Sequence, residues 1–277
     1  MRSCAPLALL AAACTAGVPV AAPEPPSTPE PPPAAPLPWP EEGAALRVLA
    51  APVGGLPLTV FLDSGHGVGT NSGNTSCLCL DEQDHNLRVA AHLAAALEAR
   101  GHRVLCSRTS AEGPSYDTRI QAARQVGADL ILGLHSDARG GMQLRSLEDG
   151  RECPWNDDNP GFAVLWSDEG EEGPVAARHH LAQAVAARLA EAGFLPNDGD
   201  EYAGIYQGES GQPGVFLDRH EPRRRIKMLR RPPMPAIIVE THHAWDRREE
   251  PRWQEEVTLQ AFDAALIAAL ADWERGR

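Results

Sequence analysis

The chain alternates between short apolar runs, which are typical of buried strands, and longer segments with apolar residues at helical spacing. The first run, from Leu58 to Leu62, ends at Asp63 and leads into a turn of small residues that contains His66. The pattern predicts further strands at 102–106, 128–134, 162–166 and 236–239, and helices at 83–100, 116–126, 175–192 and 257–273. Strands alternating with helices imply right-handed βαβ units. We therefore expect a single α/β domain, a mostly parallel twisted sheet with helices on both faces.

Charge and motifs exclude two classes of partner. The formal charge of −13 over 277 residues argues against nucleic acid, because binding to phosphates needs a basic surface. No strand is followed by a Gly-x-Gly-x-x-Gly or Walker-type motif, so nucleotide binding has no support. One segment runs against the acidic trend, the basic cluster from Arg223 to Arg231. We interpret it as a solvated helix or loop face, with an anionic-ligand patch as the alternative.

The N-terminus has the composition of an export signal. A charged start at Arg2 precedes an apolar stretch that is too short to span a membrane as a mature helix. The sequence Leu10-Ala-Ala-Ala-Cys14 resembles a bacterial lipoprotein signal, but Ala11 departs from the usual Leu, so an ordinary cleaved signal is equally open. We assign 1–17 to the signal, 18–44 to a Pro- and Ala-rich linker and 45–277 to the main globular domain. The protein is expected to be exported to the cell envelope or periplasm, tethered to a membrane through Cys14 if lipidated.

Four cysteines follow the signal, and in an exported protein an even number suggests disulfides. Cys77 and Cys79 are too close in sequence for an easy mutual bridge. We therefore expect them to pair with Cys106 and Cys153, in an order that the sequence leaves open. A zinc site built from these thiols is disfavoured by the Cys-x-Cys spacing and by the compartment.

Four polar residues are expected to meet at one edge of the sheet. His66, His135 and Glu240 each follow a strand, and Glu82 begins the helix after the first strand. Ligands of open α/β sheets bind beyond the carboxyl ends of the strands. Two imidazoles and one carboxylate form a common catalytic zinc set, and a second carboxylate can shuttle protons. Each residue also has a structural alternative, such as Glu82 favouring a helix N-terminus.

The sequence around these residues resembles the zinc-dependent N-acetylmuramoyl-L-alanine amidases of bacterial cell-wall turnover, the amidase type 3 family. Arg108 lies in a segment similar to the family's Thr-Arg after the second strand, and Arg119 lies in a segment similar to the family's Arg-containing helix. The resemblance covers about 58–273. Its four main motifs, in the family's order, are Phe61-Leu-Asp-Ser-Gly-His66-Gly, Glu82-Gln-Asp-His-Asn86-Leu, Ala128-Asp-Leu-Ile-Leu-Gly-Leu-His135 and Met234-Pro-Ala-Ile-Ile-Val-Glu240.

The resemblance implies that zinc is bound by His66, Glu82 and His135, and that Glu240 is catalytic. The substrate would be peptidoglycan, cut at the amide between the lactyl group of N-acetylmuramic acid and L-Ala of the stem peptide. With zinc as the Lewis acid, Glu240 would take a proton from the attacking water and pass it to the leaving amine. The sequence does not identify a regulatory partner.

Some positions depart from the family pattern. Ser64 replaces the usual Pro, Val68 replaces the second Gly, and Thr241-His242-His243 replaces the usual Gly-Phe. We interpret His242 and His243 as polar loop surface, with a substrate contact or stray ligand as the alternative. The segments 67–80 and 197–231 are candidates for a substrate rim or lid.

Two other functions compete with the amidase. One is a zinc peptidase or amidohydrolase on a similar sheet that acts on another peptide. The other is a peptidoglycan-binding lipoprotein without activity, which the presence of all four candidate site residues disfavours.

Overall fold

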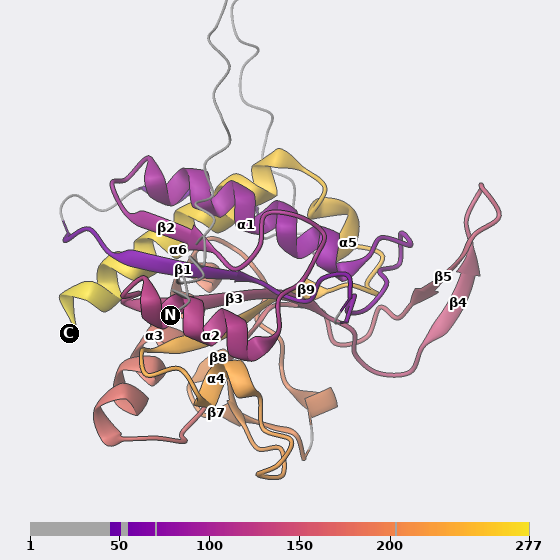
Figure 1. The fold of residues 1–277 in the computed structure, drawn as a ribbon. Coiled ribbons are helices and arrows are strands. Elements are labelled where there is room, and N and C mark those ends of the chain that lie inside the picture. Colours follow the sequence, from indigo (N-terminus) through magenta and orange to yellow (C-terminus); the bar gives the residue numbers. More distant parts are fainter. Residues whose placement is uncertain (1–44, 51–54, 70, 203, 277) are drawn as a thin grey trace, which may run out of the picture.

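A seven-stranded sheet forms the centre of the molecule (Figure 1). The computed structural model describes residues 45–50, 55–69, 71–202 and 204–276, so the predicted signal at 1–17 and linker at 18–44 lie outside the described residues. In spatial order the strands are β2 (Arg103–Cys106), β1 (Thr59–Ser64), β3 (Leu130–Asp137), β9 (Ala236–His243), β6 (Ala163–Trp166), β8 (Gln212–Asp218) and β7 (Tyr206–Glu209).

The sheet is mixed but mostly parallel. Strands β2, β1, β3 and β9 run in the same direction, so their carboxyl ends share one edge. Strand β6 runs antiparallel to β9, β8 pairs parallel with β6, and β7 is antiparallel to β8. The predicted α/β fold is confirmed, and the reversed half of the sheet is an addition to it.

Helices cover both faces of the sheet, as the sequence predicts. The larger core packs the helices α1, α3 and α6 on one face, and the smaller core packs α2 and α4 on the other (Figure 1). No helix in the described ranges is both long and apolar enough to cross a membrane. The helices are α1 (Glu82–Glu98), α2 (Tyr116–Gln125), α3 (Glu172–Glu191), α4 (Lys227–Arg230), α5 (Glu249–Arg252) and α6 (Glu256–Arg275), with a 3-10 turn at Asp200–Tyr202.

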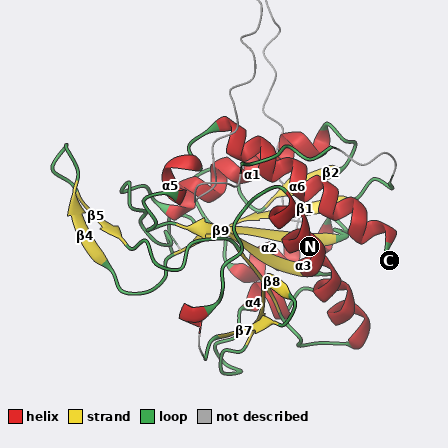
Figure 2. Cartoon of the chain, turned by 180° about the vertical axis from the view of Figure 1, so that it is seen from behind, coloured by secondary structure: helices red, strands yellow, loops and turns green. Residues whose placement is uncertain are grey.

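A β-hairpin that the sequence did not reveal projects from the body of the molecule (Figures 1 and 2). Its strands are β4 (Gln143–Ser146) and β5 (Glu152–Trp155). A disulfide between Cys79 and Cys153 ties β5 to the loop that precedes α1. Cys77 is buried and free, so the expectation that it also pairs is wrong, while the pairing of Cys79 with one of the two later cysteines is confirmed.

Two buried arginines fix the turn that follows β1. Arg108 donates from Nε to the carbonyl of Ser64 (3.0 Å) and from Nη2 to that of Gly65 (2.9 Å). Arg119 donates from Nη1 to Ser64 (2.9 Å) and from Nη2 to His66 (2.5 Å). These bonds satisfy carbonyls that the turn removes from the strand ladder, since buried backbone oxygens need partners. They also help to hold His66 at a φ of 59°, which is uncommon for a residue with a Cβ.

Arg119 also forms a buried ion pair. Its Nη1 lies 2.6 Å from Oδ1 of Asp63, and the two side chains are only 1% and 2% exposed. We predict that Arg119→Leu lowers the free energy of unfolding by about 3–5 kcal/mol, because it leaves the Asp63 charge buried without a partner. Denaturant unfolding measures this loss. Arg124→Leu, an exposed position on the same helix, is the control and should change stability by no more than about 0.5 kcal/mol; equal losses in both variants would contradict the ion pair's importance.

The disulfide yields a second prediction. Cys79→Ser should abolish the cross-link to the peptide that contains Cys153 and lower stability by about 2–4 kcal/mol, since the bond closes a long loop. Peptide mapping by mass spectrometry without reductant detects the cross-link. Cys77→Ser is the control, and it should keep the cross-link because the thiol of Cys77 is free. A cross-link that disappears in Cys77→Ser and persists in Cys79→Ser would reverse the assignment.

Candidate metal centre and active site

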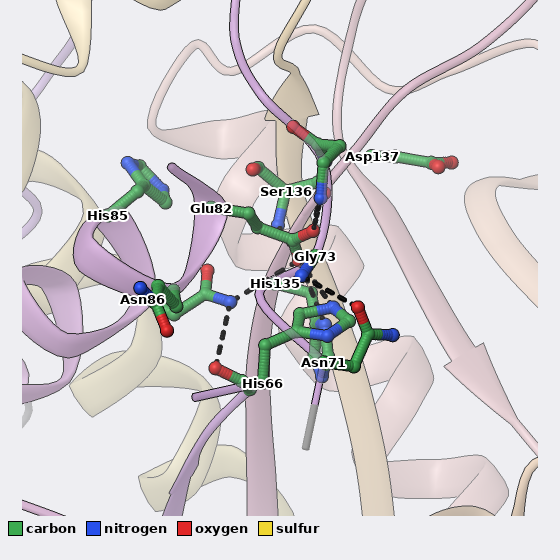
Figure 3. Close-up of polar contacts among 12 residues, drawn as sticks. His66, Asn71, Gly73, Glu82, His85, Asn86, His135, Ser136 and Asp137 are labelled. Atoms are coloured by element: carbon green, nitrogen blue, oxygen red, sulfur yellow. Dashed lines mark hydrogen bonds and ion pairs between the residues drawn. The ribbon is translucent and has the colours of Figure 1, made fainter. Parts of the chain in front are cut away.

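The four residues singled out from the sequence come together at the predicted edge. His66 lies in the turn after β1, Glu82 is the first residue of α1, and His135 and Glu240 are cross-strand neighbours on β3 and β9. Oε1 of Glu82 lies 3.1 Å from Nε2 of His66 and 3.0 Å from Nδ1 of His135. Figure 3 shows the two imidazoles side by side at this carboxylate. Their ring centroids are 4.7 Å apart and nearly perpendicular.

Local hydrogen bonds hold the Glu82 carboxylate in place. Its Oε2 accepts from the backbone N (2.9 Å) and the side-chain Nδ2 (3.0 Å) of Asn74. Its Oε1 accepts from the backbone N of Ser136 (3.2 Å) and from Nδ2 of Asn86 (3.3 Å). Asn74 reaches across to β3 as well, since its Nδ2 donates to the carbonyl of Ser136 at 2.7 Å. The loop before α1 therefore positions Glu82 relative to β3.

Two glycines permit this close approach. A Cβ at Gly65 would lie 2.3 Å from the ring of His135, and a Cβ at Gly73 would lie 2.3 Å from Oε2 of Glu82. Gly73 also has a φ of 82°, in the left-handed region that favours glycine. No larger residue fits at either position without displacing a side chain of the cluster.

The donor set of His66, Glu82 and His135 suits a divalent metal ion. Among the described residues, these three offer ligand atoms that all lie within 4.8 Å of one another. Two imidazole nitrogens and one carboxylate oxygen are ligands that Zn²⁺ commonly takes in catalytic sites. The second ring nitrogen of His66, Nδ1, is buried and lacks a hydrogen-bond partner among the described residues. The chemistry and convergence of these atoms therefore fit zinc.

The charges of the cluster are strongly coupled. Burial alone would raise the pKa of Glu82, but hydrogen bonds from His135 and His66 bring it well below its usual range. Burial would lower the pKa of His135, but the hydrogen bond to Glu82 and the charge of Glu240 raise it to about 9. The anionic Oε1 of Glu82 thus lies between Nε2 of His66 and Nδ1 of His135. A cation bound among these three atoms would take the place of their direct hydrogen bonds.

Glu240 differs from Glu82 in its surroundings. Among the described residues its carboxylate has no hydrogen-bond or ion-pair partner, and it lines a pocket rather than the protein interior. Burial and the negative charge of Asp137 raise the pKa of Glu240 to about 8, against the opposing effect of His135. A carboxyl group with a pKa near neutrality can both accept and release a proton at physiological pH.

The pocket at the cluster has a volume of about 410 Å³, within the range of roughly 300–1,000 Å³ that is usual for ligand sites. Its lining combines three of the four candidate site residues, all except Glu82, with part of the basic segment from Arg223 to Arg231. The interpretation of that segment as a solvated face therefore does not describe all of it, and the alternative of an anionic-ligand patch stays a prediction. The lining residues are His66, Tyr116, His135, Arg224, Arg225, Ile226, Lys227, Met228, Ile238 and Glu240.

His242 and His243 occupy neither the predicted loop surface nor the candidate metal centre. Both are fully buried at the end of β9. The ring of His242 stacks on Trp253, and its Nε2 lies 2.7 Å from Oε2 of Glu250. Burial and the neighbouring charges of His243 and Arg139 bring the pKa of His242 well below its usual value, so the ring is neutral. The surface interpretation is wrong because β9 continues past Glu240 into the interior.

A layer of residues behind the cluster was missed from the sequence. Thr241 donates from Oγ1 to the carbonyl of His135 (3.0 Å), and the same oxygen contacts ring nitrogens of His85 (3.1 Å) and His242 (2.9 Å). The signal that could have found this layer is the set of polar residues at positions where a strand or helix faces inward. His85 was visible in the first-helix motif, but its partners are distant in sequence.

Comparison with known proteins supports a common origin. The family model described as N-acetylmuramoyl-L-alanine amidase (Amidase_3) matches residues 60–272. N-acetylmuramoyl-L-alanine amidase CwlM of Bacillus licheniformis is 32% identical over 149 residues, which are 51% of this chain and 58% of that protein. The probable cell wall amidase LytH of Staphylococcus aureus is 23% identical over 216 residues, 76% of this chain and 57% of that protein. The matched part thus spans little more than half the length of these relatives.

The fold is shared with solved structures. The amidase Ami1 of Mycobacterium smegmatis superposes with a TM-score of 0.62 at 21% identity, covering 79% of this chain and 98% of that chain. AmiC2 of Nostoc punctiforme gives a TM-score of 0.56 at 21% identity, covering 80% and 99%. Since the family model matches most of the described domain, the chain belongs to the Amidase_3 family of N-acetylmuramoyl-L-alanine amidases.

Proposed function

We propose that this protein is a zinc-dependent N-acetylmuramoyl-L-alanine amidase that hydrolyses the bond between the lactyl group of N-acetylmuramic acid and L-Ala in peptidoglycan. The observation that carries the proposal is the convergence of His66, Glu82 and His135, two of which line a pocket together with Glu240, whose carboxylate has no partner among the described residues. Membership of the amidase family and the names of the relatives support the same bond as the target.

Zinc would be held by His66, Glu82 and His135. When bound there it would supply Lewis-acid charge for the carbonyl of the scissile amide and for an attacking water. Glu82 and the two imidazoles are already fixed by Asn74, Asn86, Ser136 and the turn after β1, so the ligands need little rearrangement.

Glu240 would act as the proton carrier. It lies across from His135 in the sheet register, so its carboxylate faces the same space as the metal ligands. We infer that it accepts the proton of the attacking water and then donates a proton to the nitrogen of the departing L-Ala. A nearby cation would lower the raised pKa of Glu240 and so favour the ionised form that starts the reaction.

Export to the cell wall follows from the same proposal. A peptidoglycan amidase works outside the cytoplasm, and the Cys79–Cys153 disulfide is typical of oxidising compartments. Within this proposal, residues 1–17 would be the export signal, 18–44 the spacer and 45–277 the zinc amidase domain. Cys14 would carry a lipid if the signal is of the lipoprotein type, and the linker would then give the domain reach from the membrane to the wall.

Glu240→Gln separates metal binding from catalysis. We predict that this variant keeps stoichiometric zinc and loses at least about 10²-fold in kcat, because the amide cannot accept a proton. Metal analysis and release of intact stem peptide from purified muropeptides, followed by mass spectrometry, measure the two properties. His66→Ala should lose both zinc and activity, and Glu148→Gln, an exposed glutamate, should retain both. Normal turnover by Glu240→Gln would contradict its assigned role.

Removal of the metal tests the cofactor. Incubation with a chelator should abolish turnover of whole sacculi, and added Zn²⁺ should restore it, since the three ligands alone provide no Lewis acid. The product identifies the bond. Free stem peptide with an intact L-Ala N-terminus supports the amidase, whereas cleavage within the stem would favour a zinc peptidase. Turnover that persists after complete zinc removal would contradict metal dependence.

A further inference from the structure

The segment that leads into α4, together with the first residue of α4, gives the pocket a mixed charge. The pocket is lined by His66, His135 and Glu240 and also by Arg224, Arg225 and Lys227. The protein as a whole carries a formal charge of −13, so three cations gathered at one pocket are contrary to its overall balance. A basic rim of this kind favours an anionic group in the ligand.

The three cations are not equally available. Arg225 pairs through Nη1 with Oδ1 of Asp168 (3.2 Å) and Oε1 of Glu169 (3.1 Å). Lys227 contacts Oδ2 of Asp117 at 2.7 Å, but the Asp117 side chain is 76% exposed, and such surface pairs contribute little.

Arg224 is exposed, and in the described part of the chain its guanidinium has no ion-pair or hydrogen-bond partner. The guanidinium that is free to bind a ligand therefore belongs to Arg224, with Lys227 as the second cation.

The substrate of the proposed reaction carries an anion close to the scissile bond. In the stem peptide, L-Ala is followed by D-glutamate that continues the chain through its γ-carboxyl, which leaves the α-carboxylate free. That carboxylate lies two residues from the scissile carbonyl, roughly 7 Å along an extended chain. In some cell walls it is converted to the neutral amide, giving D-isoglutamine. Arginine binds a carboxylate through two parallel charge-assisted hydrogen bonds, which the amide cannot match.

We propose that Arg224, assisted by Lys227, binds the free α-carboxylate of the second stem-peptide residue and makes the enzyme selective for D-isoglutamate over D-isoglutamine stems. This inference rests on the proposed amidase function and adds a substrate class to it. Arg224 is a specificity-determining residue here, and the apolar Ile226 and Met228 beside it line the intervening part of the pocket.

The test uses two muropeptides that differ only in that carboxylate or carboxamide. Zinc-loaded full-length protein should cleave the isoglutamate form with a kcat/KM about tenfold or more above that of the isoglutamine form, as expected for a charge-assisted hydrogen bond in a partly solvated site. Arg224→Gln should reduce this ratio to within about twofold of unity, mainly by losing rate on the isoglutamate form, and Arg224→Glu should invert it. Arg223→Gln is the matched control, an exposed neighbour that does not line the pocket, and it should keep the wild-type ratio.

The outcomes separate the two levels of the proposal. Equal cleavage of both muropeptides by the wild-type protein, or an unchanged ratio in Arg224→Gln, overturns the carboxylate site and leaves the amidase assignment intact. Absence of stem-peptide release from both substrates by zinc-loaded protein contradicts the amidase assignment and the selectivity with it. Loss of the ratio in Arg223→Gln as well as in Arg224→Gln would show a general charge effect and also overturn the specific role of Arg224.

Discussion

The site depends on a turn whose carbonyl groups are held by two buried guanidinium groups. Strand β1 ends at Ser64, and the chain then has to place His66 beside His135 with a left-handed φ. Arg108 and Arg119 reach this turn from segments that follow β2, and together they occupy the carbonyl oxygens of Ser64, Gly65 and His66. Asn86 also donates from Nδ2 to the carbonyl of Gly65 (3.3 Å), so removing the arginines would take the hydrogen bonds of the Ser64 and His66 carbonyls in particular. The position of one candidate metal ligand therefore depends on side chains more than forty residues away.

The same constraint links the remaining candidate ligands. Arg108 also donates to the carbonyl of Gln83 at 2.6 Å, so the turn and the start of α1 are held by a single side chain. Glu82 is thereby placed in register with the turn, while Asn74 and Ser136 connect it to β3. Because β3 and β9 are neighbouring strands in which His135 is paired with Glu240, the position of Glu240 is fixed relative to that of His135. Preorganisation of this kind is what allows a hydrolase to stabilise developing charge without moving its groups.

Much of the fold could be predicted because its strands and helices follow simple patterns. Three strands are continuous apolar runs, Val60 to Leu62, Leu130 to Leu134 and Ala236 to Val239. Because parallel strands end at one edge, these runs alone predict that the four candidate site residues meet there. Strand β8 could not be predicted, since Pro213 and Gly214 interrupt its pattern. The hairpin β4–β5 is held by a disulfide and by the antiparallel pairing of its two strands, and neither feature produces a periodic pattern in the sequence. His242 and His243 were misplaced because their burial depends on Trp253 and Glu249, contacts that only the tertiary structure supplies.

The polarity of the pocket follows from the elements that line it. His135 and Glu240 lie on the central strands β3 and β9, and His66 lies in the turn after β1. The basic lining residues belong to the segment that leads into α4 and to α4 itself, and Arg225 and Arg230 anchor this segment because both pair with Glu169. Those two arginines are used structurally, and their anchoring presents the neighbouring Arg224 at the pocket without binding it. In a segment rich in arginine, some guanidinium groups can thus form internal ion pairs while another remains available to a ligand. Composition alone cannot separate these roles, because only the tertiary contacts determine which guanidinium has a carboxylate partner within the protein.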